Sequence, residues 1–400
     1  MGLETEFPSE FQTPAAPPTV YVDEKEQPWD VKQGGELKVP ESFVWPDAMQ
    51  PKVAFNEYVD VPLIDLAPCH TGDEIGIQKV VKEVDAACRE WGAFQVINHG
   101  IPDDVVLRAR EAMKRVFHLP PEIKLKAQRD YIKNYNGFGA GSMLCPSKQW
   151  SEAFQFLMTD EAAPAVIDDY GERLFGDDKE FFCNAIKEYL IGNDKVRLLI
   201  WDLVIKGLKV KNDSFFKKYL SGSVNKGFRS NYYPPCPDPS KVVGLVVHTD
   251  STLGLVQLGD VGGYQLMKDG VWMSVNPRKG ENTLCINIGD YIEVMSNNQY
   301  KSVIHRVVTN TEEERISIDC VAQPPWDFPL STCPELIDED HPQIYKPIIG
   351  KEYQAVKLEG HVCRPQKFFT VAGDAHLELR HAAGNVFSST SDPSVVAARA

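Results

Sequence analysis

The sequence has no apolar run long enough to cross a bilayer, so we expect no membrane partner. Its first residues, Met1 to Gln12, are acidic and lack the apolar stretch of a secretory signal. Basic residues are also in short supply, since 42 Lys and Arg face 57 Asp and Glu and leave a formal charge of −15. A chain this acidic repels phosphate backbones, and no compact Lys/Arg stripe offsets the repulsion. Nucleic-acid binding is therefore not expected.

The cysteines do not suggest a disulfide framework. There are nine of them, an odd number, in a chain without a recognisable signal segment. This usage favours reduced thiols in the cytoplasm. Because 43% of the residues are hydrophobic and 25% are charged, 400 residues can bury a sizeable core. We expect a soluble, cytoplasmic enzyme.

Helical periodicity dominates the first half of the chain after an acidic, proline-containing start. Apolar residues spaced three and four apart predict helices, and Gly92 separates the first helix from a short strand. The predicted elements are a helix from Ile77 to Trp91, a strand over Ala93–Ile97, a helix from Pro102 to about Phe117, a short helix after Pro120-Pro121, and a long helix from Lys179 to about Lys209.

From Gly227 onward the chain changes to short β-branched segments bounded by turn residues. These predict strands at 244–247, 253–258, 264–267, 271–275, 283–288, 302–308 and 315–321. Lys268-Asp269-Gly270 between two of them is a hairpin signal. Many short strands with frequent turns suggest a sandwich or barrel such as a jelly roll. Residues 227–330 should form the all-β centre of the protein.

A possible metal site begins at His248-Thr249-Asp250, because residues two apart on a strand point to the same face. His305, in another strand-like segment, is the best third ligand. Two imidazoles and one carboxylate on one side of a metal form the facial triad of Fe(II) enzymes that use oxygen. Zinc is the competing metal, although no His-Glu-x-x-His motif is present. In isolation, His305 could also be a hydrogen-bonded core residue.

Arg315 and Ser317 also lie two apart on a predicted strand. A guanidinium and a hydroxyl group side by side can bind a carboxylate, and the guanidinium can do so with two donors. The alternative is a surface ion pair between Arg315 and the acidic run Glu312-Glu313-Glu314.

Several segments together resemble the Fe(II)- and 2-oxoglutarate-dependent dioxygenases of plant metabolism. They are Val61–Leu66, Trp91–Gly100 with its "WGxFxxxNHG" pattern, and Asn231–Cys236, which reads "NYYPPC". His248-x-Asp250, His305 and Arg315-x-Ser317 follow in the family's order and spacing. The resemblance extends from about Val61 to Pro325.

The resemblance implies an α+β fold with a double-stranded β-helix, or jelly-roll, core and surrounding α-helices. On this basis the chain divides into a mobile N-terminal arm (1–40), a mainly helical region (41–220), the jelly-roll core with the Fe(II)/2-oxoglutarate site (221–330), a C-terminal helical region (331–380) and a flexible tail (381–400).

The resemblance also implies roles for individual residues. His248, Asp250 and His305 would bind Fe(II), and Arg315 with Ser317 would hold the distal carboxylate of 2-oxoglutarate. Asn231 and Tyr233 match positions that contact this cosubstrate, although Tyr233 could be a core aromatic. His99 would be structural. The implied reaction hydroxylates a small molecule with O2, releases succinate and CO2, and takes ascorbate as supporting reductant.

Two segments, Phe43–Asp47 and Lys126–Arg129, resemble the gibberellin 20-oxidase branch of the family and favour a gibberellin-type diterpenoid substrate. Ser147–Glu152 and Thr249 depart from that branch, so a flavonoid or other phenolic remains an alternative. A catalytically silent receptor on the same fold is a further alternative. Trp150, Phe154 and Phe156 are candidates for the pocket wall or for the core.

Overall fold

The structure, a computed structural model, describes residues 38–51, 57–129, 136–140, 147–159, 162–220 and 225–359. Residues 1–37 of the predicted arm, the C-terminal region beyond 359 and the whole predicted tail lie outside the described residues.

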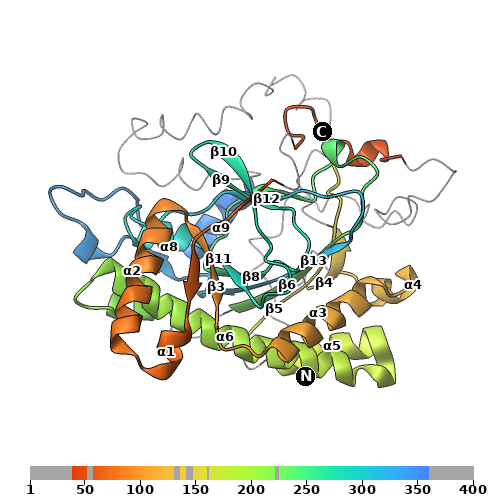
Figure 1. Cartoon of the computed structure of the whole chain (residues 1–400), viewed down its shortest axis with the longest axis horizontal. Helices are drawn as coiled ribbons and strands as arrows, with labels where there is room; N and C mark the ends of the chain where they lie inside the picture. Colours follow the sequence, from red (N-terminus) through yellow and green to blue (C-terminus); the bar gives the residue numbers. More distant parts are fainter. Residues whose placement is uncertain are drawn as a thin grey trace.

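Two β-sheets form the centre of the protein (Figure 1). The larger sheet has the strand order β2-β3-β11-β8-β13-β6-β5-β4, and the smaller has the order β1-β10-β9-β12-β7. The strands are β1 Tyr58–Val59, β2 Leu63–Asp65, β3 Ala93–Ile97, β4 Gly137–Ala140, β5 Glu152–Met158, β6 Asn225–Tyr233, β7 Leu245–His248, β8 Gly254–Gln257, β9 Tyr264–Lys268, β10 Val271–Val275, β11 Leu284–Asn287, β12 His305–Val307 and β13 Arg315–Gln323. A separate pair joins β14 (Pro329–Leu330) and β15 (Ile348–Ile349).

Helices cover the outer face of the larger sheet, with α6 running along it and α2, α3 and α5 packed against α6 (Figure 1). The helices are α1 Ala67–Thr71, α2 Glu74–Glu90, α3 Asp103–Phe117, α4 Pro121–Lys124, α5 Ala163–Phe175, α6 Glu180–Leu208, α7 Ser214–Leu220, α8 Asp290–Met295 and α9 Gly350–Glu359. The main hydrophobic core lies between these helices and the sheet.

Strand alternation gives the larger sheet two different faces. On β13, Ile318 and Cys320 belong to the core shared with the helices. A second apolar cluster, which we call the barrel interior, lies on the opposite face between the two sheets. Tyr233, Val256 and Leu266 belong to it. Because side chains alternate along a strand, Arg315 and Ser317 face this interior.

The predicted α+β jelly-roll class is confirmed, and the predicted helices and strands after Ile77 match observed elements within a few residues. After Ile77, the elements that were not predicted are the strands β4, β5, β6, β14 and β15 and the helices α5, α7 and α8. Because β4 and β5 join the larger sheet, that sheet extends into the 41–220 region that we expected to be mainly helical. In β5 five of the seven residues are buried, on both faces of the strand, so the segment lacks the alternation that would identify a strand from the sequence.

Candidate active site

Strand pairing brings the two predicted histidine ligands together. Strands β7 and β12 are antiparallel, and His305 lies directly opposite His248. The centroids of their rings are 4.1 Å apart. Nδ1 of His248 lies 2.8 Å from the carbonyl oxygen of Val246, and Nδ1 of His305 lies 3.2 Å from that of Val303. Such backbone contacts fix each ring so that Nε2 is the atom available to a metal.

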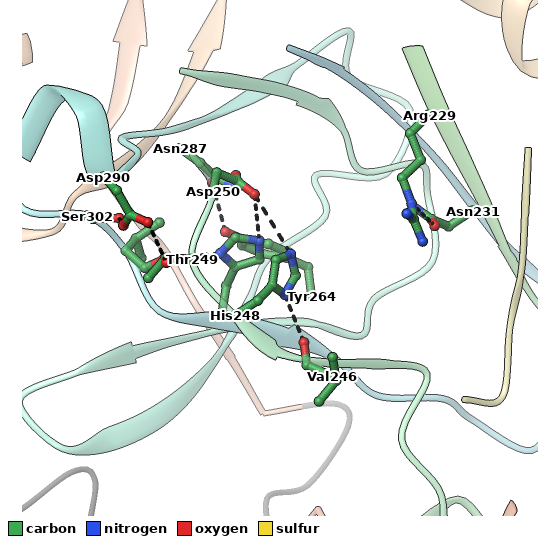
Figure 2. A network of polar contacts seen from close by, with 12 residues as sticks. Arg229, Asn231, Val246, His248, Thr249, Asp250, Tyr264, Asn287, Asp290 and Ser302 are labelled. Atoms are coloured by element: carbon green, nitrogen blue, oxygen red, sulfur yellow. Dashed lines mark hydrogen bonds and ion pairs between the residues drawn. The ribbon is translucent and has the colours of Figure 1, made fainter. Parts of the chain in front are cut away.

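Asp250, just beyond the end of β7, completes the group. Its Oδ1 lies 3.8 Å from Nε2 of His248 and 3.7 Å from Nε2 of His305. One ligand atom from each of the three residues falls within 4.8 Å of the other two. Asn287 Nδ2 donates to the second carboxylate oxygen, at 3.0 Å, and Tyr264 donates in turn to Asn287 at 2.8 Å (Figure 2). The carboxylate is therefore oriented with one oxygen toward the imidazoles.

The electrostatics of the group suit a cation. Burial, and then the neighbouring His305, lower the pKa of His248 to about 3. Burial alone would raise the pKa of Asp250, but the two imidazoles and Asn287 outweigh it and hold that pKa below its ordinary value. Neutral imidazoles and an ionised carboxylate are the forms that bind a metal ion. Two nitrogen ligands and one oxygen ligand on one side suit Fe(II).

Behind the metal-binding group, Thr249 points to the other side of the chain and donates to Asp290 at 3.1 Å (Figure 2). Asp290 is almost fully buried and also accepts a hydrogen bond from Ser302, at 2.6 Å. Helix α9 adds two more donors, Tyr353 at 2.6 Å and Lys357 at 2.9 Å. Thr249 faces away from His248, Asp250 and His305. Its departure from the gibberellin 20-oxidase pattern therefore concerns a contact that supports the segment from His248 to Asp250 and not the metal-binding group itself.

The predicted carboxylate clamp faces the barrel interior. Arg315 lies opposite Tyr233, and Ser317 lies opposite Asn231, on the paired strands β13 and β6. Arg315 is 2% exposed and donates through Nε to the carbonyl oxygen of Val261 at 3.2 Å. Its Nη1 and the hydroxyl of Tyr233 are buried without a hydrogen-bond partner. Buried donors without partners are costly, so this wall fits an anionic ligand.

The alternative reading of Arg315 as a surface ion pair is wrong. The residue is buried, whereas Glu314 turns outward and pairs with Lys114 at 2.9 Å and with His118 at 2.7 Å. Burial lowers the pKa of Arg315, but a guanidinium remains protonated at neutral pH. The positive charge in the barrel interior is therefore available to a ligand.

Two other predicted positions have clear contacts. Asn231 accepts a hydrogen bond from Arg229 Nε at 2.8 Å, and its role at the cosubstrate stays a prediction (Figure 2). His99 lies 3.0 Å from Asn282 and accepts from the backbone N–H of Ile101 at 3.2 Å. It is absent from the metal-binding group, as expected for a structural histidine.

The aromatic candidates for the pocket wall are core residues. Trp150 is fully buried, donates to the carbonyl oxygen of Pro234 at 3.1 Å and packs edge-on against Phe43. Phe154 and Phe156 lie on the helix side of β5 and contact Tyr170. Both are on the opposite face of the sheet from Asn231, and Trp150 belongs to a separate apolar cluster with Phe43. None of the three belongs to the apolar cluster of the barrel interior.

The segments that resemble gibberellin 20-oxidases also have structural roles. Trp45 is buried and donates to the carbonyl oxygen of Lys148 at 3.0 Å. Arg129 is buried and donates to the carbonyl oxygens of Gly137 and Ala153 at 3.5 and 3.4 Å. These contacts stabilise the fold and carry no information about a substrate.

Several residues that support the site were not predicted from the sequence. Asn287 and Asp290 support Asp250 and Thr249, but nothing in their spacing reveals a contact across 37 or 41 residues. Asp319 continues the two-residue alternation of the predicted strand after Ser317, and its place on the site face could have been predicted. Arg229 stands two residues before Asn231, but no strand was predicted for that segment.

Comparison with known families agrees with this fold and geometry. Residues 224–324 match the 2OG-Fe(II) oxygenase superfamily, and residues 61–176 match the family described as non-haem dioxygenase in morphine synthesis N-terminal. The site and fold thus define a non-haem dioxygenase. The chain belongs to the 2OG-Fe(II) oxygenase superfamily and is an enzyme that uses Fe(II) and 2-oxoglutarate.

Individual relatives have names that refer to different compound classes. Gibberellin 20 oxidase 2 of Oryza sativa subsp. indica is 32% identical over 72% of this chain and 76% of its own length. Jasmonate-induced oxygenase 2 of Arabidopsis thaliana is 30% identical over 79% and 84%. Flavonol synthase 1 of Crocosmia x crocosmiiflora is 33% identical over 80% and 93%.

Solved structures support the fold. JOX2 in complex with 2OG, Fe and JA superimposes with a TM-score of 0.70 at 26% identity, covering 85% of this chain and 98% of that chain. A dioxygenase for auxin oxidation from rice gives a TM-score of 0.62 at 26% identity, covering 76% and 96%. Within the described ranges, no helix has the length and apolarity needed to cross a membrane.

Proposed function

We propose that this protein oxidises a C–H bond of a small plant metabolite in a reaction that consumes O2 and 2-oxoglutarate and releases succinate and CO2. His248, Asp250 and His305 hold Fe(II), and Arg315 with Ser317 holds the distal carboxylate of 2-oxoglutarate. The observation that carries the proposal is the pairing of a complete His-Asp-His group with unsatisfied donors, Arg315 Nη1 and Tyr233 OH, in one barrel interior.

The residues of the chain position the reactants and exclude water. Iron bound by the three ligands would supply oxygen binding and activation, which no side chain can provide. Arg315 offers two parallel N–H donors to a carboxylate, and the nearby hydroxyl of Tyr233 adds a third donor. Val256, Leu266 and Val303 surround the site with apolar surface, so an electrostatic contact is stronger there than in water.

For the substrate, we propose a gibberellin-type diterpenoid first and a flavonoid or other phenolic second. Gibberellin 2-beta-dioxygenase 8 of Arabidopsis thaliana, 35% identical over 68% of this chain and 77% of its own length, supports the first choice. Similarity to flavonol synthase 1 supports the second. Because relatives of both classes have similar identities to this chain, a substrate panel must include both.

A silent receptor would normally lose a metal ligand or the cosubstrate arginine, and this chain keeps all four residues. We further propose that the protein acts as a cytoplasmic monomer with ascorbate as supporting reductant. The seven cysteines in the described ranges are all free thiols, which agrees with a reducing compartment.

The test is succinate release by the purified protein with Fe(II), 2-oxoglutarate, ascorbate and a metabolite library containing gibberellin precursors and flavonoids. We expect succinate together with a product one oxygen heavier than its substrate. The variants H248A, D250A and H305A should fold normally by circular dichroism but lose iron and turnover. Full activity of H305A would contradict the metal assignment. Activity without oxygen would favour a zinc hydrolase, and tight ligand binding without any succinate would favour a receptor.

A further inference from the structure

Asp319 places an acidic group in the barrel interior, on the same strand as the carboxylate clamp. On β13 it follows Arg315 and Ser317 at two-residue intervals, so all three side chains share one face. Its neighbours in register are Arg229 on β6 and Val256 on β8. Val256 belongs to the apolar cluster of the interior. Asp319 therefore faces the barrel interior, on the side of β13 that carries the carboxylate clamp.

The carboxyl group of Asp319 has an unsatisfied oxygen. Its Oδ1 is buried and has no hydrogen-bond partner. Arg229, the cross-strand neighbour, is turned to other groups and donates through Nε to Asn231 at 2.8 Å and through Nη1 to Gln155 at 3.0 Å. In the close view, Arg229 and Asn231 lie on the right, apart from His248 and Asp250 of the metal-binding group (Figure 2).

Asp319 is half-buried, and its buried Oδ1 is costly to leave without a partner. Burial and the nearby charge of Asp250 raise the pKa of Asp319, while Arg229 opposes the rise. An unsatisfied buried polar group costs free energy comparable to a lost hydrogen bond. No ion pair or hydrogen bond within the described residues involves Oδ1, so the fold itself does not explain an acidic residue at this position. Among the described interior residues, Asp319 is thus a candidate for ligand contact.

The chemistry of the partner follows from the carboxyl group. A ligand carboxylate would be repelled by an ionised Asp319, and an apolar group would leave Oδ1 unsatisfied. A hydroxyl group can donate to the ionised form, and it can both accept from and donate to the protonated form. It therefore satisfies Asp319 in either state of charge.

We propose that Asp319 is a specificity-determining residue that binds a hydroxyl group of the prime substrate inside the barrel. The inference rests on the proposed function, because it assumes that a substrate enters the barrel interior. It selects among substrates by one polar contact: a hydroxylated compound binds in preference to the same compound without that hydroxyl. The contact also orients the substrate relative to the metal-binding group.

The test measures binding without turnover. Protein loaded with Fe(II) and 2-oxoglutarate is titrated under nitrogen with pairs of compounds that differ by one hydroxyl. Dihydrokaempferol and naringenin form one pair, and further pairs come from gibberellins and jasmonates with and without a hydroxyl. The wild type should bind the hydroxylated member of at least one pair roughly 10-fold more tightly, as expected for one hydrogen bond to a carboxyl group.

The variants D319A and D319V should reduce that ratio to below about 3-fold, since neither side chain can hydrogen bond. Both should keep the KM for 2-oxoglutarate. The matched control is D269N, at an exposed hairpin position, and it should keep the wild-type ratio. The proposal is overturned if the wild type prefers no hydroxylated member, if the variants retain the preference, or if neither variant folds, which would make Asp319 structural.

Failure of the proposed function gives a different result. Wild-type protein in air, with 2-oxoglutarate and no prime substrate, should release succinate slowly, and the Asp319 variants should do the same. Absence of succinate from the wild type under every condition contradicts the proposed oxidation. If the wild type releases succinate but the Asp319 variants keep the same preference for the hydroxylated compound, only the present inference is contradicted.

Discussion

Lys357 of helix α9 donates a hydrogen bond to Asp290, with 2.9 Å between Nζ and Oδ2. Asp290 accepts from Thr249 through the same oxygen, and its backbone N–H donates to the carbonyl oxygen of Asp250 at 2.9 Å. The C-terminal helix is thereby connected to the segment that carries two of the three proposed iron ligands. We infer that α9 helps to hold His248 and Asp250 in the geometry that iron requires.

Replacing Lys357 by Met should destabilise this segment. One donor to a buried carboxylate is lost, and since a quarter of the Lys357 side chain is exposed we expect a cost of about 1–2 kcal/mol. Weaker iron binding, with a nearly unchanged KM for 2-oxoglutarate at saturating iron, is the expected pattern. The measurements are iron titration and chemical denaturation, with K346M at an exposed position as control. Equal iron affinity in both variants would show that α9 has no part in positioning the ligands.

The sequence predicts that two site residues share a face wherever they lie two apart on one strand. His248 and Asp250 are two residues apart, as are Arg315 and Ser317, and each pair shares a face because a strand alternates its side chains. The third proposed ligand, His305, was chosen because it lies in a strand-like segment and matches the family's order and spacing. Its position opposite His248 depends on the register of β7 and β12, which a single sequence does not determine.

Long-range support could not be predicted for the same reason. Asn287 contacts Asp250, and Lys357 contacts Asp290, only because separate strands and helices converge in the folded protein. The residue types give no warning, since Asn and Lys are most often exposed and a single sequence does not show which of them contact a distant segment. For Phe154 and Phe156 the sequence left the pocket wall and the core open, and the structure places both in the core because they face the helices.

Asn287 should be important for iron affinity although it contacts no metal. Its Nδ2 donates to Asp250 Oδ2 at 3.0 Å and keeps the other oxygen directed at the imidazoles. Removing such a supporting contact typically costs about 10–100-fold in metal affinity. We therefore expect N287A to bind Fe(II) that much more weakly, as measured by competition with a chelator. A circular dichroism spectrum like that of the wild type would show that the loss is local, whereas unchanged affinity would contradict the supporting role.

Glu152 should make stability depend on pH. It is buried beside Lys124, at 2.9 Å, and burial raises its pKa from 4.5 to about 7 despite that lysine. Because its pKa is higher in the folded state, the stabilisation is complete below about pH 4.5 and is lost as the pH rises toward 7 and above. Between about pH 6 and about pH 8 the free energy of unfolding should fall by about 1 kcal/mol from this group.

The variant E152Q should remove that part of the pH dependence, because an amide does not titrate in this range. Urea denaturation at the two pH values measures the effect, and E172Q, at an exposed ion pair, serves as the matched control. A fall in stability that is equal in wild type, E152Q and E172Q would assign the pH dependence to other groups.

Arg315 offers the most specific test of cosubstrate recognition. If it binds the distal carboxylate of 2-oxoglutarate, R315Q removes a buried, charge-assisted contact worth about 1.5–3 kcal/mol. The KM for 2-oxoglutarate should rise roughly 10- to 150-fold. R315K should fail in the same direction, because an ammonium group cannot supply two parallel donors. The exposed Arg173, paired with Asp169, provides the control R173Q, which should behave like the wild type.

Two further measurements separate cosubstrate binding from general damage to the site. Iron affinity should hardly change in R315Q, because Arg315 is not in the metal-binding group. Affinity for the prime substrate, measured at saturating 2-oxoglutarate, should also change little. A general collapse of the barrel would weaken all three ligands together. An unchanged KM for 2-oxoglutarate in both Arg315 variants would mean that the buried guanidinium serves the fold, and that another residue binds the cosubstrate carboxylate.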